Sequence, residues 1–172
     1  MKIIFLDIDG VMNHQLFYKE EKEKNIDYSK ETSQEYDSRQ FDPRCMELLN
    51  HIIEKTGAKV VVSSSWRSGR TVEDLQDLLQ GVGFKGEVIG KTPHLFFANK
   101  DYDKSVPRGC EIKAWLETNK GILGDKMTKV RYVILDDDSD MMYWQRESFL
   151  WVDSYCGLTP NITQKVILFL NR

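Results

Sequence analysis

The sequence predicts a single α/β domain in which a parallel sheet of about five strands carries helices on both faces. Short apolar segments alternate along the chain with longer segments whose apolar residues recur at a spacing of three or four. Strands and helices that alternate in this way form parallel sheets through crossover connections. A length of 172 residues with 41% apolar content suffices for one hydrophobic core, so we expect one domain over residues 1–172.

The expected strands are five apolar segments rich in β-branched residues, and the expected helices are four amphipathic segments. The strands are predicted at residues 2–7, 58–62, 87–89, 130–135 and 149–152. Helical spacing is found at residues 46–53, 72–79, 112–116 and 162–170. Asp42-Pro43 and Gly57 are start and stop signals for the first helix, and Thr159-Pro160 begins the last one.

Residues 14–42 do not follow this alternation. The segment is charged, net acidic and poor in aliphatic side chains, so it cannot form a core of its own. We therefore expect a small charged insertion after the first strand, flexible or partly helical. The two interpretations are a solvated surface loop and a minimal cap that grips the substrate.

Composition limits the classes of function. The formal net charge of −3 lacks the basic signature of a dedicated nucleic-acid-binding domain, so a polyanionic substrate has to be bound by a local group of side chains. The apolar start is interrupted by Asp7, and no later segment is long enough to span a membrane, which predicts a cytoplasmic protein without membrane contact. Cys45, Cys110 and Cys156 are odd in number and widely spaced, so we expect reduced thiols. No feature predicts a stable protein partner.

Polar clusters follow three of the expected strands. Asp7 and Asp9 follow the first strand, serines at 63–65 follow the second, and acids at 136–138 and 140 follow the fourth. Ligands of parallel sheets bind at the carboxyl ends of the strands, so we expect these side chains to meet. Two carboxylates after a buried strand repel each other unless a cation lies between them. The pattern therefore indicates a metal site.

A calcium-binding loop is a rival interpretation of the late acidic cluster. Asp136, Asp138, Asp140 and Glu147 fall at positions 1, 3, 5 and 12 of an EF-hand loop. Position 6 of that loop requires Gly, and here it is Met141. A strand rather than a helix is also expected before the cluster, so this interpretation is excluded.

Two further classes of site find no support. The chain has neither a GxxxxGK nor a GxGxxG motif, which argues against an ATP-dependent kinase. His14, His51 and His94 share no spacing suited to a metal or a catalytic triad, so we expect structural or exposed histidines.

The ordered motifs resemble the haloacid dehalogenase (HAD) superfamily, whose phosphatases use an Asp-x-Asp start, a Ser or Thr after the second strand, a Lys or Arg, and a late acidic pair. The stretches VVVSSSWR, VIGKTP, RGCEIKAWL, VILDDDSDM and GLT look like the HAD domains of RNA-repair (Swiss Army Knife) proteins. The general layout is similar to the 3′-phosphatase domain of polynucleotide kinase-phosphatases. The resemblance covers nearly the whole chain and implies a Rossmann-like HAD fold.

The resemblance implies a Mg2+-dependent phosphatase that works through an aspartyl-phosphate intermediate. Asp7 would be the nucleophile and a metal ligand. Asp9 would be the general acid and base, and it would also lend its backbone carbonyl to the metal. Asp136 or Asp137 would complete the metal shell, with Asp140 nearby to orient the ligand.

Further polar side chains are candidates for contact with the phosphoryl group or with the rest of the substrate. Ser63, the first polar residue after the second strand, is our first choice for a hydrogen bond to a phosphoryl oxygen, and Ser64 is the alternative. Arg67 is a candidate for a bidentate clamp on a second phosphate or a terminal group. Arg108 matches the position of the charge-neutralising residue, where many superfamily members have Lys, and Lys113 is the alternative.

The predicted function is hydrolysis of a phosphate monoester, and the RNA-repair resemblance suggests a phosphorylated RNA or DNA end as the substrate. Arg67 and Arg70 are the nearest candidates for contacts with the adjoining backbone phosphates. One alternative is a phosphatase of a small phosphorylated metabolite or nucleotide. Another is a HAD-fold binding module without turnover.

Overall fold

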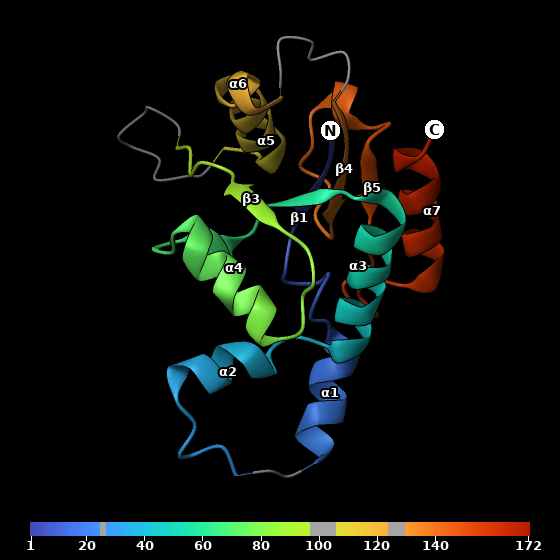
Figure 1. Ribbon diagram of the computed structural model, residues 1–172. Helices are drawn as coiled ribbons and strands as arrows, with labels where there is room; N and C mark the ends of the chain where they lie inside the picture. Colours follow the sequence, from blue (N-terminus) through green and yellow to red (C-terminus); the bar gives the residue numbers. More distant parts are fainter. Residues whose placement is uncertain (25–26, 97–105, 124–129) are drawn as a thin grey trace.

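The computed structural model describes residues 1–24, 27–96, 106–123 and 130–172 (Figure 1). Parallel strands form one sheet in the order β3-β2-β1-β4-β5. The strands are β1 (Lys2–Leu6), β2 (Lys59–Val62), β3 (Val88–Lys91), β4 (Arg131–Asp136) and β5 (Phe149–Trp151). The prediction of a parallel α/β sheet with about five strands is confirmed.

The helices of the described residues either pack on the two faces of this sheet or lie in the insertion at residues 14–42. They are α1 (Gln15–Glu23), α2 (Ser33–Arg39), α3 (Pro43–Thr56), α4 (Val72–Gly81), α5 (Arg108–Thr118), α6 (Lys120–Leu123) and α7 (Pro160–Leu170). The buried side chains of α3, α4 and α7 belong to the larger core cluster, and those of α5 belong to a second cluster. As predicted, α3 begins after the Asp42 cap with Pro43 and ends at Gly57, whose φ is 64°.

Strand β1 lies at the centre of the sheet, between β2 and β4, and it is buried on both faces because helices pack against each of them. Ile4 and Leu6 contribute to the larger core cluster, while Ile3 and Phe5 contribute to the cluster that includes α5. Phe5 packs edge-on against Trp115 of α5, with 5.5 Å between the ring centroids. This alternation fixes the register of β1, and so it fixes where the following residues leave the sheet.

The strand boundaries differ from the predicted ones by one or two residues. The largest difference is in β3, which continues through Gly90 and Lys91, where the apolar segment stops. Gly90 faces Trp115, and a Cβ there would come within 2.7 Å of the indole nitrogen. Close packing of α5 over β3 therefore explains a glycine inside a strand.

The insertion at residues 14–42 contains α1 and α2, which lie beyond the carboxyl edge of the sheet (Figure 1). Its two ends are joined, because the imidazole of His14 hydrogen-bonds to the Asp42 carboxylate over 2.8 Å and both side chains are buried. Phe17 of α1 and Phe41 after α2 are also buried, whereas α2 itself has no buried residue. The insertion is thus anchored near its ends and exposed in the middle.

Cys45 lies beside the pair of His14 and Asp42, and one ligand atom from each of these residues lies within 4.8 Å of the others. The thiol of Cys45 donates to the carbonyl of Leu158 over 3.6 Å, and burial raises its pKa to about 12. Hydrogen bonds within the protein already occupy a ligand atom of each side chain, because His14 Nε2 pairs with Asp42 Oδ2 and the Cys45 thiol donates to Leu158. The three side chains therefore form a structural cluster that fixes the base of the insertion.

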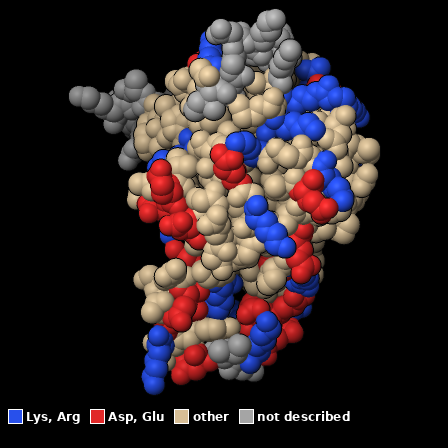
Figure 2. All heavy atoms as spheres, in the orientation of Figure 1, with Lys and Arg blue, Asp and Glu red and all other residues tan. Residues whose placement is uncertain are grey.

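The exposed surface of the insertion carries both signs of charge. Figure 2 shows Lys and Arg interspersed with Asp and Glu over the region of α1 and α2, so this region has no continuous basic surface in that view. Within the described ranges, none of the helices combines the length and the apolar character that crossing a bilayer requires.

Candidate active site

The topological switch point of the sheet lies between β1 and β4, because the chain continues from β1 to β2 on one side and returns to β4 on the other. In open α/β sheets the carboxyl ends of the strands at such a point form a ligand-binding crevice. Asp7 follows β1 and Asp136 is the last residue of β4, so both carboxylates lie at this crevice. Carboxylate oxygens of Asp7, Asp136 and Asp137 all lie within 4.8 Å of one another.

Burial raises the pKa values of the carboxyl groups in this cluster. It raises the pKa of Asp7 to about 6, although the charge of Arg108 and a hydrogen bond with the Ser64 hydroxyl act in the opposite direction. Burial also raises the pKa of Asp136 to about 8, and the neighbouring Asp7 carboxylate adds to the rise. The pKa of Asp137 is raised as well, chiefly by burial. Without a cation, these carboxyl groups therefore release their protons at a higher pH than ordinary carboxyl groups do.

The cluster fits a hard divalent cation. Asp136 Oδ2 is buried and has no hydrogen-bond partner among the described residues. A buried charged oxygen without a partner is costly, and a cation removes that cost. Carboxylate oxygens are the ligands that Mg2+ and Ca2+ prefer. Gly10, with a φ of 74°, leaves space for the Asp137 carboxylate, which a Cβ at this position would overlap.

The side chain of Asp9 is exposed but held in place. Trp66 Nε1 donates to both carboxylate oxygens over 3.0 and 3.1 Å, and Asn13 Nδ2 donates to Oδ1 over 2.9 Å. Asn13 Oδ1 accepts in turn from the backbone N–H of Gly10. Asp9 also borders a cavity of about 320 Å³ between the insertion and the turn after β2. It is therefore placed to exchange a proton with a group that occupies this cavity.

Of the two serine candidates, the structure places Ser64 against Asp7. The Ser64 side chain is completely buried, and its hydroxyl hydrogen-bonds with the Asp7 carboxylate. Ser63, our first choice, is turned toward the end of β3, where the Thr92 hydroxyl donates to it over 3.5 Å. Successive side chains of an extended backbone point in opposite directions, so only one of the two serines faces the crevice.

Arg108 brings positive charge to the acidic cluster. Its Nε lies 3.7 Å from Asp136 Oδ2, which is an ion-pair distance but too long for a hydrogen bond. Asp140 holds Arg108 in position, because Asp140 Oδ2 accepts from the backbone N–H of Arg108 over 2.7 Å at the start of α5. The alternative candidate, Lys113, pairs with Glu117 on the exposed side of α5. The structure thus brings Arg108 to the cluster and directs Lys113 to the surface.

Arg67 does not occupy the position that we expected. We expected it to clamp a substrate phosphate, but its side chain is only 2% exposed and ion-pairs with Glu111 of α5, with 2.5 Å between Nη2 and Oε2. Its Nη1 donates to the backbone carbonyl of Ser64 over 2.6 Å. Arg67 therefore joins the turn after β2 to α5 and positions the crevice residues Ser64 and Arg108.

The sequence did not identify three residues that shape the site: Asn13, Trp66 and Glu111. The spacing of Glu111 could have indicated its burial, because it lies one helical turn after Arg108 and one turn before Trp115, on the buried face of α5. Asn13 and Trp66 lie in turns without a periodic pattern, so only their proximity to the two motifs could have indicated them.

One family profile, described as "HAD domain in Swiss Army Knife RNA repair proteins", matches residues 3–162. The matched range contains the whole acidic cluster, the insertion and every other site residue described above. No curated protein and no solved structure matches the chain.

We expect Mg2+ to stabilise the protein more at pH 8 than at pH 5. The folded-state pKa values of Asp7 and Asp136, about 6 and about 8, lie above the ordinary value of 3.8. The stability that their bound protons provide is therefore complete below about pH 4 and is lost as the pH rises through 6 and 8. Thermal unfolding should show a Tm higher by about 3 °C or more with millimolar Mg2+ at pH 8, and a smaller rise at pH 5.

The Asp136→Asn variant is the control for this measurement. A Tm that Mg2+ does not change at pH 8, or that Mg2+ raises equally in the wild type and in Asp136→Asn, would argue against a cation site in this cluster.

The substitution Glu111→Gln should destabilise the fold, because it leaves the Arg67 guanidinium buried without an opposite charge. Urea unfolding should show a loss of about 3 kcal/mol in the free energy of unfolding. Lys113→Gln breaks an exposed ion pair on the same helix and should cost less than about 0.5 kcal/mol. Similar losses in the two variants would contradict the positioning role of Arg67 and Glu111.

Proposed function

The chain belongs to the family of HAD domains in Swiss Army Knife RNA repair proteins, and we propose that it is a magnesium-dependent phosphatase that acts on a phosphorylated polynucleotide end. The observation that carries the proposal is the meeting of Asp7, Asp136 and Asp137 at the switch point of the sheet, beside Arg108 and Ser64. A phosphate monoester resists attack by an anionic group, and positive charge at the site removes that obstacle.

Asp7, Asp136 and Asp137 would hold the Mg2+, together with the backbone carbonyl of Asp9, as the resemblance implies. When bound, the ion would neutralise charge on the phosphoryl oxygens and on the attacking carboxylate. The buried Oδ2 of Asp136, which has no hydrogen-bond partner among the described residues, supports this assignment.

Asp7 is the nucleophile in this proposal. A carboxylate oxygen of Asp7 attacks phosphorus, the bond from phosphorus to the leaving oxygen breaks, and an aspartyl-phosphate forms on Asp7. The backbone N–H of Ile8, 2.8 Å from Asp7 Oδ1, and the hydroxyl of Ser64 orient the carboxylate. Arg108 supplies a fixed positive charge beside the transferring group, already in place before the reaction.

Asp9 is the general acid and base. It gives a proton to the leaving oxygen in the first step, and in the second it takes a proton from the water that hydrolyses the aspartyl-phosphate. Trp66 and Asn13 hold its carboxylate between the crevice and the cavity of about 320 Å³. The part of the substrate that leaves must therefore lie in or beside this cavity.

The description of the family supports a polynucleotide end as the substrate, because it places these domains in RNA repair proteins. The net charge of −3 means that such a substrate is bound by local contacts rather than by a broad basic surface. Those contacts have to come from the residues around Asp9, where the leaving group lies.

The substitution Asp7→Asn should abolish hydrolysis of p-nitrophenyl phosphate in the presence of Mg2+, because the amide keeps the shape of the side chain and loses the nucleophile. Thermal unfolding should show that the variant is folded. Residual activity within about tenfold of the wild type, which corresponds to about 1.4 kcal/mol in the barrier, would contradict this mechanism.

The substitution Asp136→Asn should raise the Mg2+ concentration that is needed for half-maximal activity, because a neutral amide is a weaker ligand than a carboxylate. Asp138→Asn is the matched control, since Asp138 is exposed and lies outside the cluster. Mg2+ titrations of p-nitrophenyl phosphate hydrolysis should separate the two variants by about tenfold or more, with activity lost in EDTA. The same Mg2+ dependence in both variants would contradict the ligand assignment.

A further inference from the structure

The cavity beside Asp9 has the residues of a nucleobase-binding site. It measures about 320 Å³, which lies at the small end of the range for organic ligands. Its lining includes the aromatic rings of Tyr18 from α1, Tyr36 from α2 and Trp66 from the turn after β2. Tyr18 is 40% exposed and Tyr36 is 53% exposed, so these rings are available to a ligand. Exposed aromatic rings that line one hollow are typical of surfaces on which bases stack.

We propose that this cavity binds the terminal nucleoside of the substrate, with its base against the rings of Tyr36 and Trp66. The inference rests on the proposed function and adds to it the place and the chemistry of substrate recognition. The position of Asp9 locates the nucleoside, because a general acid must contact the leaving oxygen and the Asp9 carboxylate borders this cavity. The nucleoside is the leaving group, so it belongs on the side of Asp9 that faces away from Asp7.

The walls of the cavity are fixed before a ligand binds. Trp66 is held by its hydrogen bonds to Asp9 and by an edge-on contact with Phe41, with 5.3 Å between the ring centroids. Arg70 lies over the Trp66 ring and pairs with Asp37 of α2, which ties the insertion to the turn after β2. Walls that are already in place reduce the conformational entropy that the protein loses when a ligand binds.

The charges around the cavity favour a neutral group over a phosphate. Asp9 and Asp37 contribute two carboxylates, and Arg70 is the only cation among the described lining residues. Because Asp37 already neutralises Arg70, this arginine does not have the free positive charge that we expected it to offer to a backbone phosphate. Carboxylates accept hydrogen bonds from the amino groups of bases. The phosphoryl group therefore belongs at Arg108 and the base belongs in this cavity.

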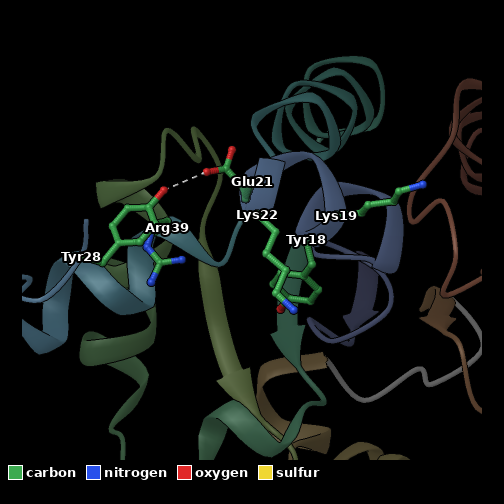
Figure 3. Close-up of a pocket in the computed structure, with 6 residues that line it drawn as sticks. All are labelled: Tyr18, Lys19, Glu21, Lys22, Tyr28 and Arg39. Atoms are coloured by element: carbon green, nitrogen blue, oxygen red, sulfur yellow. Dashed lines mark hydrogen bonds between the residues drawn. The ribbon is translucent and has the colours of Figure 1, made fainter. Parts of the chain in front are cut away.

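A second cavity, of about 560 Å³, shares the lining residue Tyr18 with the first. Figure 3 shows it between α1 and α2, with Tyr28 and Arg39 on one side and Tyr18 and Lys22 on the other. Arg39 lies over the Tyr28 ring, 3.8 Å from its centroid. Lys22 brings a cation to the opposite wall. This cavity is placed to receive the next nucleotide of a single-stranded end, so that the insertion serves as a cap.

Binding by the full-length Asp7→Asn protein in EDTA tests the site without turnover. The probes are two short, fluorescently labelled oligonucleotides with a terminal phosphate, identical except that the terminal nucleotide of one is abasic. Each is used as single-stranded RNA and as single-stranded DNA. We expect the abasic end to bind about tenfold more weakly, because it loses one base–aromatic stack. Equal Kd values for the complete and the abasic ends would overturn the proposal.

Substitutions at Tyr36, combined with Asp7→Asn, locate the base. Tyr36→Ala should weaken binding of the complete end about tenfold and leave binding of the abasic end unchanged, whereas Tyr36→Phe should bind both as the parent does. Tyr143→Ala is the matched control, because Tyr143 is 78% exposed and lines neither cavity. The same loss in Tyr36→Ala and Tyr143→Ala, or a loss in Tyr36→Ala with the abasic end as large as with the complete end, would overturn the assignment.

The two proposals fail in different ways. Absence of p-nitrophenyl phosphate hydrolysis by the wild-type protein with Mg2+ would contradict the phosphatase, while the difference between the complete and the abasic end would still support the nucleoside site. Hydrolysis of p-nitrophenyl phosphate without that binding difference would support the phosphatase and contradict the nucleoside site.

Discussion

The carboxylates at the carboxyl edge of the sheet impose the constraint on which the site depends. Asp7 and Asp136 terminate two adjacent strands, and the pairing of Leu6 with Leu135 brings them together. Burial penalises both negative charges, and their proximity adds repulsion. Only a bound proton or a cation offsets both the burial penalty and the repulsion. The buried central strands therefore end in a group of negative charges that needs a bound proton or cation to be stable.

The surrounding residues supply part of that positive charge and hold it in place. Asp140 anchors the start of α5, so that Arg108 lies beside Asp136. The buried pair of Arg67 and Glu111 joins the same helix to the turn that carries Ser64. A buried ion pair contributes little net stability, but removing one partner is costly, so it holds the two segments in one arrangement. The site is thus assembled from three strand ends and one helix start, and each is fixed by contacts that do not face the ligand.

The sequence predicted the sheet and the acidic cluster because both follow from simple periodicity. An apolar strand followed by two acids places carboxylates at the sheet edge, whatever the rest of the chain does. The choice between Ser63 and Ser64 could not be made, because it depends on which way the backbone turns after β2. The burial of Arg67 and its ion pair could not be predicted for a similar reason. Its partner Glu111 is 44 residues away, and only the docking of α5 brings the two together. The helix α2 in the insertion could not be predicted from apolar periodicity, because it buries none of its side chains. The position of the insertion beside Asp9 depends on long-range contacts, such as the ion pair of Asp37 with Arg70.

The central claim is that Asp7 is the group that accepts the phosphoryl group, and a covalent intermediate tests it most directly. The protein would be mixed with a phosphorylated substrate and Mg2+, quenched in acid within one turnover, digested and examined by mass spectrometry. The account predicts one phosphoryl group on the peptide that contains Asp7, assigned to Asp7 rather than Asp9 by fragmentation, and none in Asp7→Asn. Turnover of the substrate without any phosphorylated peptide, or with the phosphoryl group on another residue, would contradict it.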